Sequence, residues 1–292
     1  MAARSRRRAL VPVLAVAAAL LVSCGSQQAP GPGASSTTTI EAPAFRGAPS
    51  DLIGVWAADG PDVPDGVLLT IAADEIRIWW GDCGATMLPW RASPSGMFAS
   101  SVSGWSGRCG DDAGRAPWLT GATAWRAIDG GAELLKGVDV VGQLAPTTST
   151  PTPGPDVAQS KATPEPQTDE QRTMFDSVPA LPAGARPVTA ADLVGTWVVP
   201  GRTASGSVDT PHARFSKDGT WKGSDGCNSN GGQWRADGSG SLIATAGVQT
   251  LIGCDGAAVP SWVSSAAAAG IEDGTLVLVG WDGKVVGRLQ RA

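Results

Sequence analysis

The sequence has no tyrosine, one histidine (His212), five cysteines and no Cys-x-x-Cys pair among its 292 residues. Without Cys-x-x-Cys the usual redox-active thiol pair is missing, and a zinc site built on one cysteine pair would lack two ligands. The chain also has no Gly-x-Ser-x-Gly elbow and no phosphate-binding loop, and a serine nucleophile would find an imidazole base only at His212. These absences predict that the protein is not an enzyme and that it binds no metal or cofactor.

The chain also lacks the excess of positive charge that nucleic-acid binding requires. Its formal net charge is −5, and four of its arginines lie within residues 1–23 together with no acidic residue. Loss of this segment would change the net charge to −9, so we expect no nucleic-acid partner. Arginine outnumbers lysine, and alanine and glycine are abundant, a composition typical of a GC-rich bacterial genome such as that of an actinobacterium.

Residues 1–23 have the pattern of a secretory signal peptide. Four arginines precede an apolar run over 9–22, which is shorter than the ~20 residues of a membrane-spanning helix. The run ends in Leu21-Val22-Ser23-Cys24, which resembles a bacterial lipobox. The resemblance implies cleavage before Cys24, acyl chains such as palmitate at that residue, and anchoring on the extracytoplasmic side of the membrane. The alternative is a simple signal peptide beside an unrelated cysteine, which the missing Ala-x-Ala cleavage site disfavours.

Composition divides the rest of the chain into two polar segments and two longer regions. Residues 24–48 and 145–173 are rich in proline, threonine, serine and alanine. Such segments cannot bury enough apolar surface to order themselves, and proline favours extended spacing. We therefore predict a disordered tether over 24–48 and a linker over 146–187. The remaining regions, 49–145 and 188–292, each have the length of one small domain.

The two predicted domains are copies of each other. Their matches keep the same order along the chain, with an offset that drifts only from 141 to 145 residues. The matched pairs are 51–56 with 192–197, Cys83 with Cys227, 90–92 with 234–236, Cys109 with Cys254, Trp118 with Trp262, and 140–144 with 285–289. A tandem duplication with few later insertions explains this correspondence.

Turn residues and apolar periodicity predict mostly strands. Four Asp-Gly pairs of the second domain lie between short apolar runs, at 218–219, 237–238, 273–274 and 282–283. Asp-Gly favours two-residue hairpin turns, and the last pair predicts a hairpin of 275–280 with 284–290. An alanine-rich stretch over 257–270, matched by 115–128, fits one short helix. Each domain is therefore predicted to be a β-rich α+β fold, a curved antiparallel sheet or partial barrel with one helix.

With this order of elements, the second domain resembles the META family, the HslJ-like domains. The residues that carry the resemblance are Leu193, Gly195 and Trp197, the turn Gly226-Cys227-Asn228, Thr250 with Cys254, and Asp282-Gly283 before the last strand. The match covers about 188–291, and the first domain is META-like through its similarity to the second. It departs from the motif at Gly84, which stands where Asn228 stands. The resemblance implies an envelope or secreted protein, often a lipoprotein, loosely linked to stress tolerance, and it brings no catalytic residues.

Four cysteines remain after Cys24 in a chain that we expect to be exported, where thiols oxidise. Three pairings are formally possible. Duplication favours Cys83–Cys109 and Cys227–Cys254, because each copy must have been able to fold alone. These bridges would close loops of 26 and 27 residues, for which the chain-entropy model gives ~3–4 kcal/mol each.

Tryptophan is unusually frequent, with twelve residues against four phenylalanines. Those at matched positions predict core packing, whereas Trp79, Trp80, Trp105 and Trp125 are private to the first domain. Neighbours on a strand point to opposite faces. If one of Trp79 and Trp80 is buried, the other should be exposed, where a large aromatic side chain usually marks a contact. The alternative is a contact between the domains or partial burial under a loop.

Polar residues offer weaker candidates. Asn228 follows a cysteine at a turn, where asparagine most often bonds its own backbone, and ligand contact is the alternative. Asp59, Asp62 and Asp65 lack the alternate spacing of a calcium loop. We expect them to lie in a solvated loop.

These patterns together predict a lipid-anchored, extracytoplasmic envelope protein that is a structural or binding module without enzymatic activity. Its predicted partners are the membrane, through Cys24, and a cell-wall polymer or an envelope protein. The alternative is a binding protein for cell-wall glycan or a small apolar ligand, which would use the tryptophans private to the first domain.

Overall fold

The computed structural model describes residues 47–107, 116–152, 162–202, 209–250, 252–253 and 256–292, apart from the side chain of Asp82. The predicted signal peptide, Cys24 and almost all of the predicted tether lie outside these residues, as do Cys109 and Cys254. In the part of the chain that is described, no helix is long and apolar enough to cross a bilayer.

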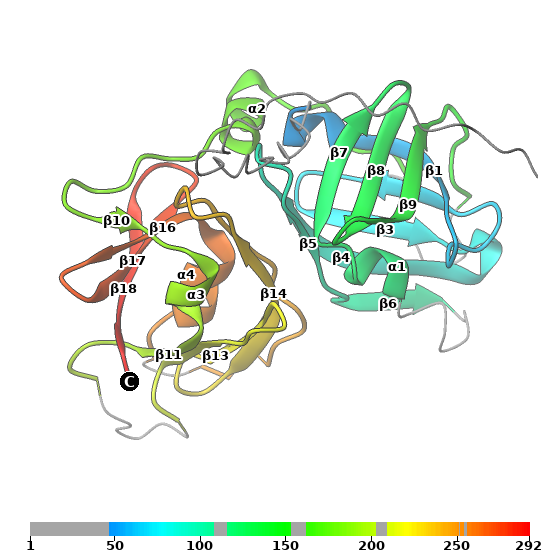
Figure 1. Cartoon of the computed structure of the whole chain (residues 1–292). Helices are drawn as coiled ribbons and strands as arrows, with labels where there is room; N and C mark the ends of the chain where they lie inside the picture. The colour runs from blue at the N-terminus through cyan, green and yellow to red at the C-terminus, as the bar shows by residue number, and fades with distance from the viewer. Residues whose placement is uncertain (1–46, 108–115, 153–161, 203–208, 251, 254–255) are drawn as a thin grey trace, which may run out of the picture. The chain divides into compact units, whose positions relative to one another are not determined.

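The first domain is a sheet of nine strands with three short helical segments (Figure 1). The strands are β1 (Gly54–Asp59), β2 (Leu68–Ile71), β3 (Glu75–Trp79), β4 (Gly84–Ala92), β5 (Phe98–Ser100), β6 (Gly104–Gly107), β7 (Ala124–Ile128), β8 (Gly131–Lys136) and β9 (Asp139–Pro146). The helical segments are η1 (Pro49–Leu52), η2 (Gly81–Cys83) and α1 (Pro117–Thr120). Hydrogen-bonded neighbours follow the order β5-β4-β3-β2-β1-β9-β8-β7, and β6 pairs with β4.

The second domain is also a sheet of nine strands. Its strands are β10 (Arg186–Pro187), β11 (Gly195–Val198), β12 (His212–Phe215), β13 (Thr220–Ser224), β14 (Ser229–Ala236), β15 (Leu242–Ala244), β16 (Ala266–Glu272), β17 (Thr275–Gly280) and β18 (Val285–Arg291). Three helices are described from the linker onward: α2 (Asp169–Asp176), α3 (Ala190–Leu193) and α4 (Val259–Ser265). The strand order is β10-β16-β17-β18-β11-β12-β13-β14-β15.

The two sheets share one topology. If β1–β5 are matched with β11–β15 and β7–β9 with β16–β18, the strand orders are the same, with β6 and β10 added. In each domain an isolated bridge joins the two ends of the shared order, Met97 to Ala124 and Ser241 to Ala268. Each antiparallel sheet therefore curls back on itself, which confirms the predicted β-rich α+β fold. The shared order is what a tandem duplication would produce.

Asp-Gly pairs close hairpins as expected. Asp273 and Gly274 both have positive φ, 48° and 78°, which the type I′ hairpin turn requires. Gly283 has φ 75° in the turn between β17 and β18, and these strands pair Leu276 with Leu289. The predicted terminal hairpin is confirmed.

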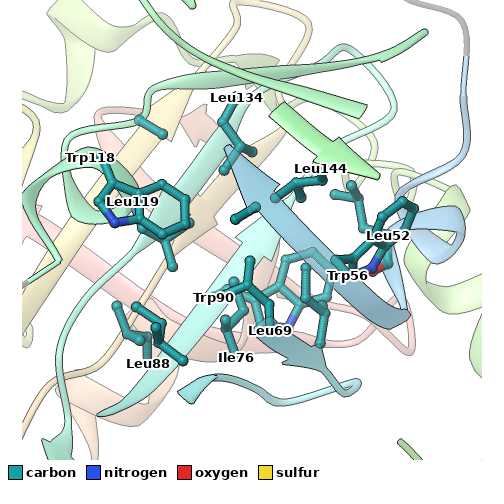
Figure 2. Close-up of a cluster of buried hydrophobic side chains, with 14 of the residues drawn as sticks. Leu52, Trp56, Leu69, Ile76, Leu88, Trp90, Trp118, Leu119, Leu134 and Leu144 are labelled. Atoms are coloured by element: carbon teal, nitrogen blue, oxygen red, sulfur yellow. The ribbon is translucent and has the colours of Figure 1, made fainter. Parts of the chain in front are cut away.

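Side chains fill the interior of each curled sheet. Figure 2 shows Trp56, Trp90 and Trp118 converging with leucines from several strands of the first domain. Trp56 donates its indole N–H to the carbonyl oxygen of Leu52 at 2.8 Å. Trp197 makes the matching bond to the carbonyl four residues before it, also at 2.8 Å. Trp56 and Trp197 therefore belong to the cores, and each also satisfies its one polar atom.

A second repeated contact explains the Val-Val-Gly sequence near the end of each domain. A Cβ on Gly142 of β9 would lie 3.1 Å from a ring carbon of Trp118, which α1 carries. A Cβ on Gly287 of β18 would lie 2.6 Å from a ring carbon of Trp262, which α4 carries. Real Cβ atoms rarely approach so closely, so glycine makes room for the helix tryptophan in both copies.

The helix of each domain is shorter than predicted. α4 ends at Ser265, and the alanines after it form β16, so the prediction of one helix over 257–270 is wrong in its second half. α1 likewise ends at Thr120, before β7. Ala268 and Ala269 are neighbours on β16, and both are buried. They lie in two different apolar clusters, one on each face of the strand. A strand covered on both faces needs small side chains, and this packing overrides the helix propensity of alanine.

The described part of the linker contains a helix and docked side chains, which corrects the expectation of an extended segment over 146–187. α2 begins with a capping box, in which Thr168 and Gln171 bond each other's backbone N–H at 2.9 and 3.2 Å. Ala162 is buried, and Phe175 packs against the first core. The average composition of the segment is polar, but these few apolar residues suffice to dock it. At its far end β10 joins the second sheet.

Candidate functional site

Trp79 and Trp80 point into different clusters, and neither is exposed. Trp79 is 3% exposed and lies with Ala85 and Ala162 in a small apolar cluster. Trp80 is half-buried, packs against the main core and donates its indole N–H to the Thr86 hydroxyl at 2.9 Å. The expectation of opposite directions holds, but the expectation that one of the pair is exposed is wrong.

Residue 162 of the linker is the reason for the burial of Trp79. The Trp79 indole N–H donates to the Thr70 hydroxyl at 2.9 Å, and that hydroxyl donates to the carbonyl of Ala162 at 2.8 Å. The linker thereby covers the outer face of β3. Sequence alone did not predict this cover, because the segment reads as a disordered linker.

The other two tryptophans that are private to the first domain differ sharply in their exposure. Trp125 is 2% exposed in the first core and donates its indole N–H to the Ser93 carbonyl at 3.2 Å. Trp105 is 69% exposed on β6. Of the four candidates, Trp105 alone presents a large aromatic surface to solvent, where such a side chain usually marks a contact.

Asn228 organises a loop through four side-chain hydrogen bonds. Its Nδ2 donates to the Asp225 carboxylate at 3.0 Å and to the Ile252 carbonyl at 2.8 Å. Its Oδ1 accepts from the Thr250 hydroxyl at 2.9 Å and from the Ile252 N–H at 2.6 Å. The residue is 8% exposed. The amide is fully engaged within the protein, so the structure gives it a structural role.

The described cysteines lie beside the segments that lead to their predicted partners. Cys83 and Cys227 each take part in a disulfide bond. Gly84 pairs with Gly107 across β4 and β6, so residue 83 lies next to the chain that leads to residue 109. The bonds of Asn228 to Ile252 bring Cys227 equally close to the chain that leads to residue 254. Because Cys109 and Cys254 lie outside the described residues, the pairing stays a prediction.

His212 lies near one backbone carbonyl and one carboxylate. His212 Nδ1 lies 2.8 Å from the Thr210 carbonyl and 3.4 Å from the Asp209 carboxylate, at the start of β12. Asp59, Asp62 and Asp65 are exposed, as expected for a solvated loop. Among the residues that the structure describes, no three His, Cys, Asp or Glu side chains lie together so that they could hold a metal ion.

The repeated Trp-Arg-Ala segment places a half-buried guanidinium in each domain. Arg91 Nη1 donates to the Trp90 carbonyl at 2.8 Å. Arg235 Nη1 donates to the carbonyls of Trp234 and Gly219, at 2.5 and 3.0 Å. Burial lowers the pKa of both arginines, against the opposing effect of Asp74 or Asp218. The Nε atoms of both are buried and make no hydrogen bond within the described part.

An open pocket lies beside Arg235. Its volume is about 600 Å³, and its walls include Ala191 and Val194 from the α3 region, Lys217 from the β12–β13 turn, and Trp234. The lining is mainly apolar, with two cations and one acid among the second-domain residues. Such a surface can bind an apolar group together with an anionic one. In the sequence, only the repeated Trp-Arg-Ala segment could have indicated this pocket.

Comparison with family models, with curated proteins and with solved structures found no match for the chain. The resemblance of the second domain to META domains therefore stays a prediction.

Proposed function

We propose that this chain is a lipid-anchored protein of the extracytoplasmic face, in which two META-like domains form a non-enzymatic structural or binding module that contributes to stress tolerance. Acylated Cys24 is the membrane contact, and residues 24–48 are the tether. The domains bind a component of the envelope rather than transform a substrate.

The shared strand order of the two sheets is the observation that carries this proposal. In both domains buried apolar side chains pack inside the curled sheet, the matched tryptophans among them. Asn228, the polar candidate for ligand contact, is bonded inside the fold. These features support a rigid module that presents its outer surface, because they leave little inside the sheets for substrate chemistry.

The test of anchoring compares Cys24→Ala with the matched variant Ser26→Ala, two residues further along the tether. A fatty-acid label should mark the wild type and Ser26→Ala and should be absent from Cys24→Ala, because the thioether forms on the Cys24 sulfur. Cys24→Ala should also leave the membrane fraction. Equal labelling of all three proteins would refute the lipoprotein proposal.

A second candidate function is glycan binding through Trp105, which its 69% exposure favours. Sugar rings stack on flat aromatic faces, and such stacking depends on an accessible indole. Co-sedimentation with insoluble cell wall should fall for Trp105→Ala and persist for Val138→Ala, a matched change at a residue that is 90% exposed. Sedimentation that is unchanged by Trp105→Ala, or absent in the wild type, would exclude this function.

A further inference from the structure

The linker helix α2 occupies a pocket on the first domain. The Phe175 ring stacks on Trp90, with 5.9 Å between the ring centroids and 19° between the ring planes. The Asp176 carboxylate accepts hydrogen bonds from the backbone N–H and the hydroxyl of Ser50, at 2.9 and 2.7 Å. An aromatic side chain followed by a carboxylate therefore fixes this helix in place.

The second domain has the corresponding pocket. α3 takes the place of η1, Trp234 that of Trp90, Arg235 that of Arg91, and the β12–β13 turn that of the β2–β3 turn. All four of these second-domain features contribute to the walls of the open pocket beside Ala191. Their counterparts in the first domain are the features that α2 contacts or lies against.

One pocket is covered, and the other is open. Pro49 and Ser50 of η1 are buried, whereas Ala190 and Ala191 at the same places in α3 are exposed. The space left beside Phe175 is about 170 Å³, and Trp281 of the second domain is one of its lining residues. The pocket beside α3 has about 600 Å³, and Thr123 of the first domain is one of its lining residues. Among the described residues, none fills the second pocket as Phe175 fills the first.

We infer that the second-domain pocket docks a short segment of a partner protein in which an aromatic residue is followed by an acidic one. Trp234 and the aliphatic side chains of α3 receive the aromatic ring, since apolar contact with such surface is favourable. Lys217 and Arg235 receive the carboxylate, and Asp218 is the one acid among the second-domain lining residues. Ala191 lacks the hydroxyl that Ser50 offers, so Lys217 replaces that hydrogen bond by charge.

The occupant belongs to another polypeptide because α2 of the chain is already engaged. Phe175 cannot stack on Trp90 and enter the second pocket at the same time. Lys217 and Ala191 also differ from the residues at the first pocket, so the two sites have different preferences. The first pocket serves the fold, and the second is available for recognition.

The test uses the purified chain and a fluorescent peptide of residues 165–180, which contains Phe175 and Asp176. Fluorescence anisotropy should show one peptide bound per wild-type chain. Ala191→Trp, which fills the pocket from an exposed position, should weaken binding about tenfold or more through loss of the buried ring. Ala183→Trp, at an exposed site outside the pocket, should leave binding unchanged.

Two further measurements make each outcome decisive. Lys217→Glu should weaken binding of the peptide but not of its Asp176→Asn version, and it tests the pocket even if Ala191→Trp fails to fold. A Phe175→Ala chain frees the first pocket and should bind two peptides. If that chain binds one peptide and the wild type none, the probe is competent and the proposal is overturned. Dimerisation that Ala191→Trp abolishes would also overturn it, because the occupant would then be a second copy of the chain.

Discussion

Asn228 and Trp56 represent two structural roles of single residues in this protein: Asn228 holds a loop, and Trp56 fills a core. Trp56 and its match Trp197 fill the cores and donate to a backbone carbonyl, so they form the same contact in both domains. Asn228 has no match, because Gly84 takes its place. A Cβ on Gly84 would lie 2.0 Å from the Ser106 carbonyl oxygen on β6. The extra strand of the first domain therefore requires glycine where the second domain uses asparagine to hold a loop.

Replacement of Asn228 by alanine tests its structural role. The change removes four hydrogen bonds and leaves the Asp225 carboxylate, the Thr250 hydroxyl and the backbone N–H and carbonyl of Ile252 without the Asn228 amide. We expect the free energy of unfolding to fall by about 2–3 kcal/mol, measured by urea denaturation. Ser229→Ala, at an exposed neighbouring residue, is the control and should change it by less than about 0.5 kcal/mol. An unchanged stability in Asn228→Ala would contradict this account.

Gly287→Ala tests the contact between helix and strand. The new methyl group would meet the Trp262 ring at 2.6 Å, so the tryptophan must shift in a packed core. We expect a loss of about 1–3 kcal/mol in the same denaturation experiment. The double variant Gly287→Ala with Trp262→Leu should lose less than the sum of the single changes, because the ring that clashes is gone. Strict additivity would show that the contact does not matter.

At the scale of elements, the sequence predicted strands and turns better than helices. Asp-Gly pairs act locally through φ, so the terminal hairpin could be predicted from a few residues. The alanines of β16 could not, because their strand conformation depends on apolar clusters on both faces, which residues distant in sequence provide. For the same reason, the sequence did not predict that residue 162 covers Trp79 or that α2 docks on the first domain. The exposure of a side chain depends on such distant contacts. The sequence therefore could not show which one of the four candidate tryptophans is accessible.

We expect the stability that the contact between β10 and α3 contributes to depend on pH. The Arg186 guanidinium, followed by hydrogen bonds from Thr189, holds the pKa of the Asp192 carboxyl well below its ordinary value. A lowered pKa in the folded state contributes stability that is present above the unfolded pKa of about 4 and is lost as pH falls further. The stability difference between the wild type and Asp192→Asn should therefore be larger at pH 6 than at pH 3. The effect is small because the pair is exposed, and an equal difference at both pH values would contradict it.

At the scale of the whole molecule, the chain carries two copies of one fold, and we propose that it is exported. The copies have the same strand order, the same tryptophan contacts and one described disulfide-bonded cysteine each. They have diverged at their surfaces, where the first domain gained β6, the exposed Trp105 and the cover of α2. The second domain kept its corresponding pocket open. The two copies are thus alike in strand order and core tryptophan contacts, and they differ on their outer surfaces.

Mass-spectrometric mapping of unreduced peptides from the natively exported protein tests this account most directly, because it reports both the independence of the copies and their compartment. We predict peptides linked through Cys83–Cys109 and Cys227–Cys254, each closed within one domain. A link between the domains, such as Cys83–Cys227 or Cys109–Cys254, would contradict independent copies, and four free thiols would contradict export to an oxidising compartment.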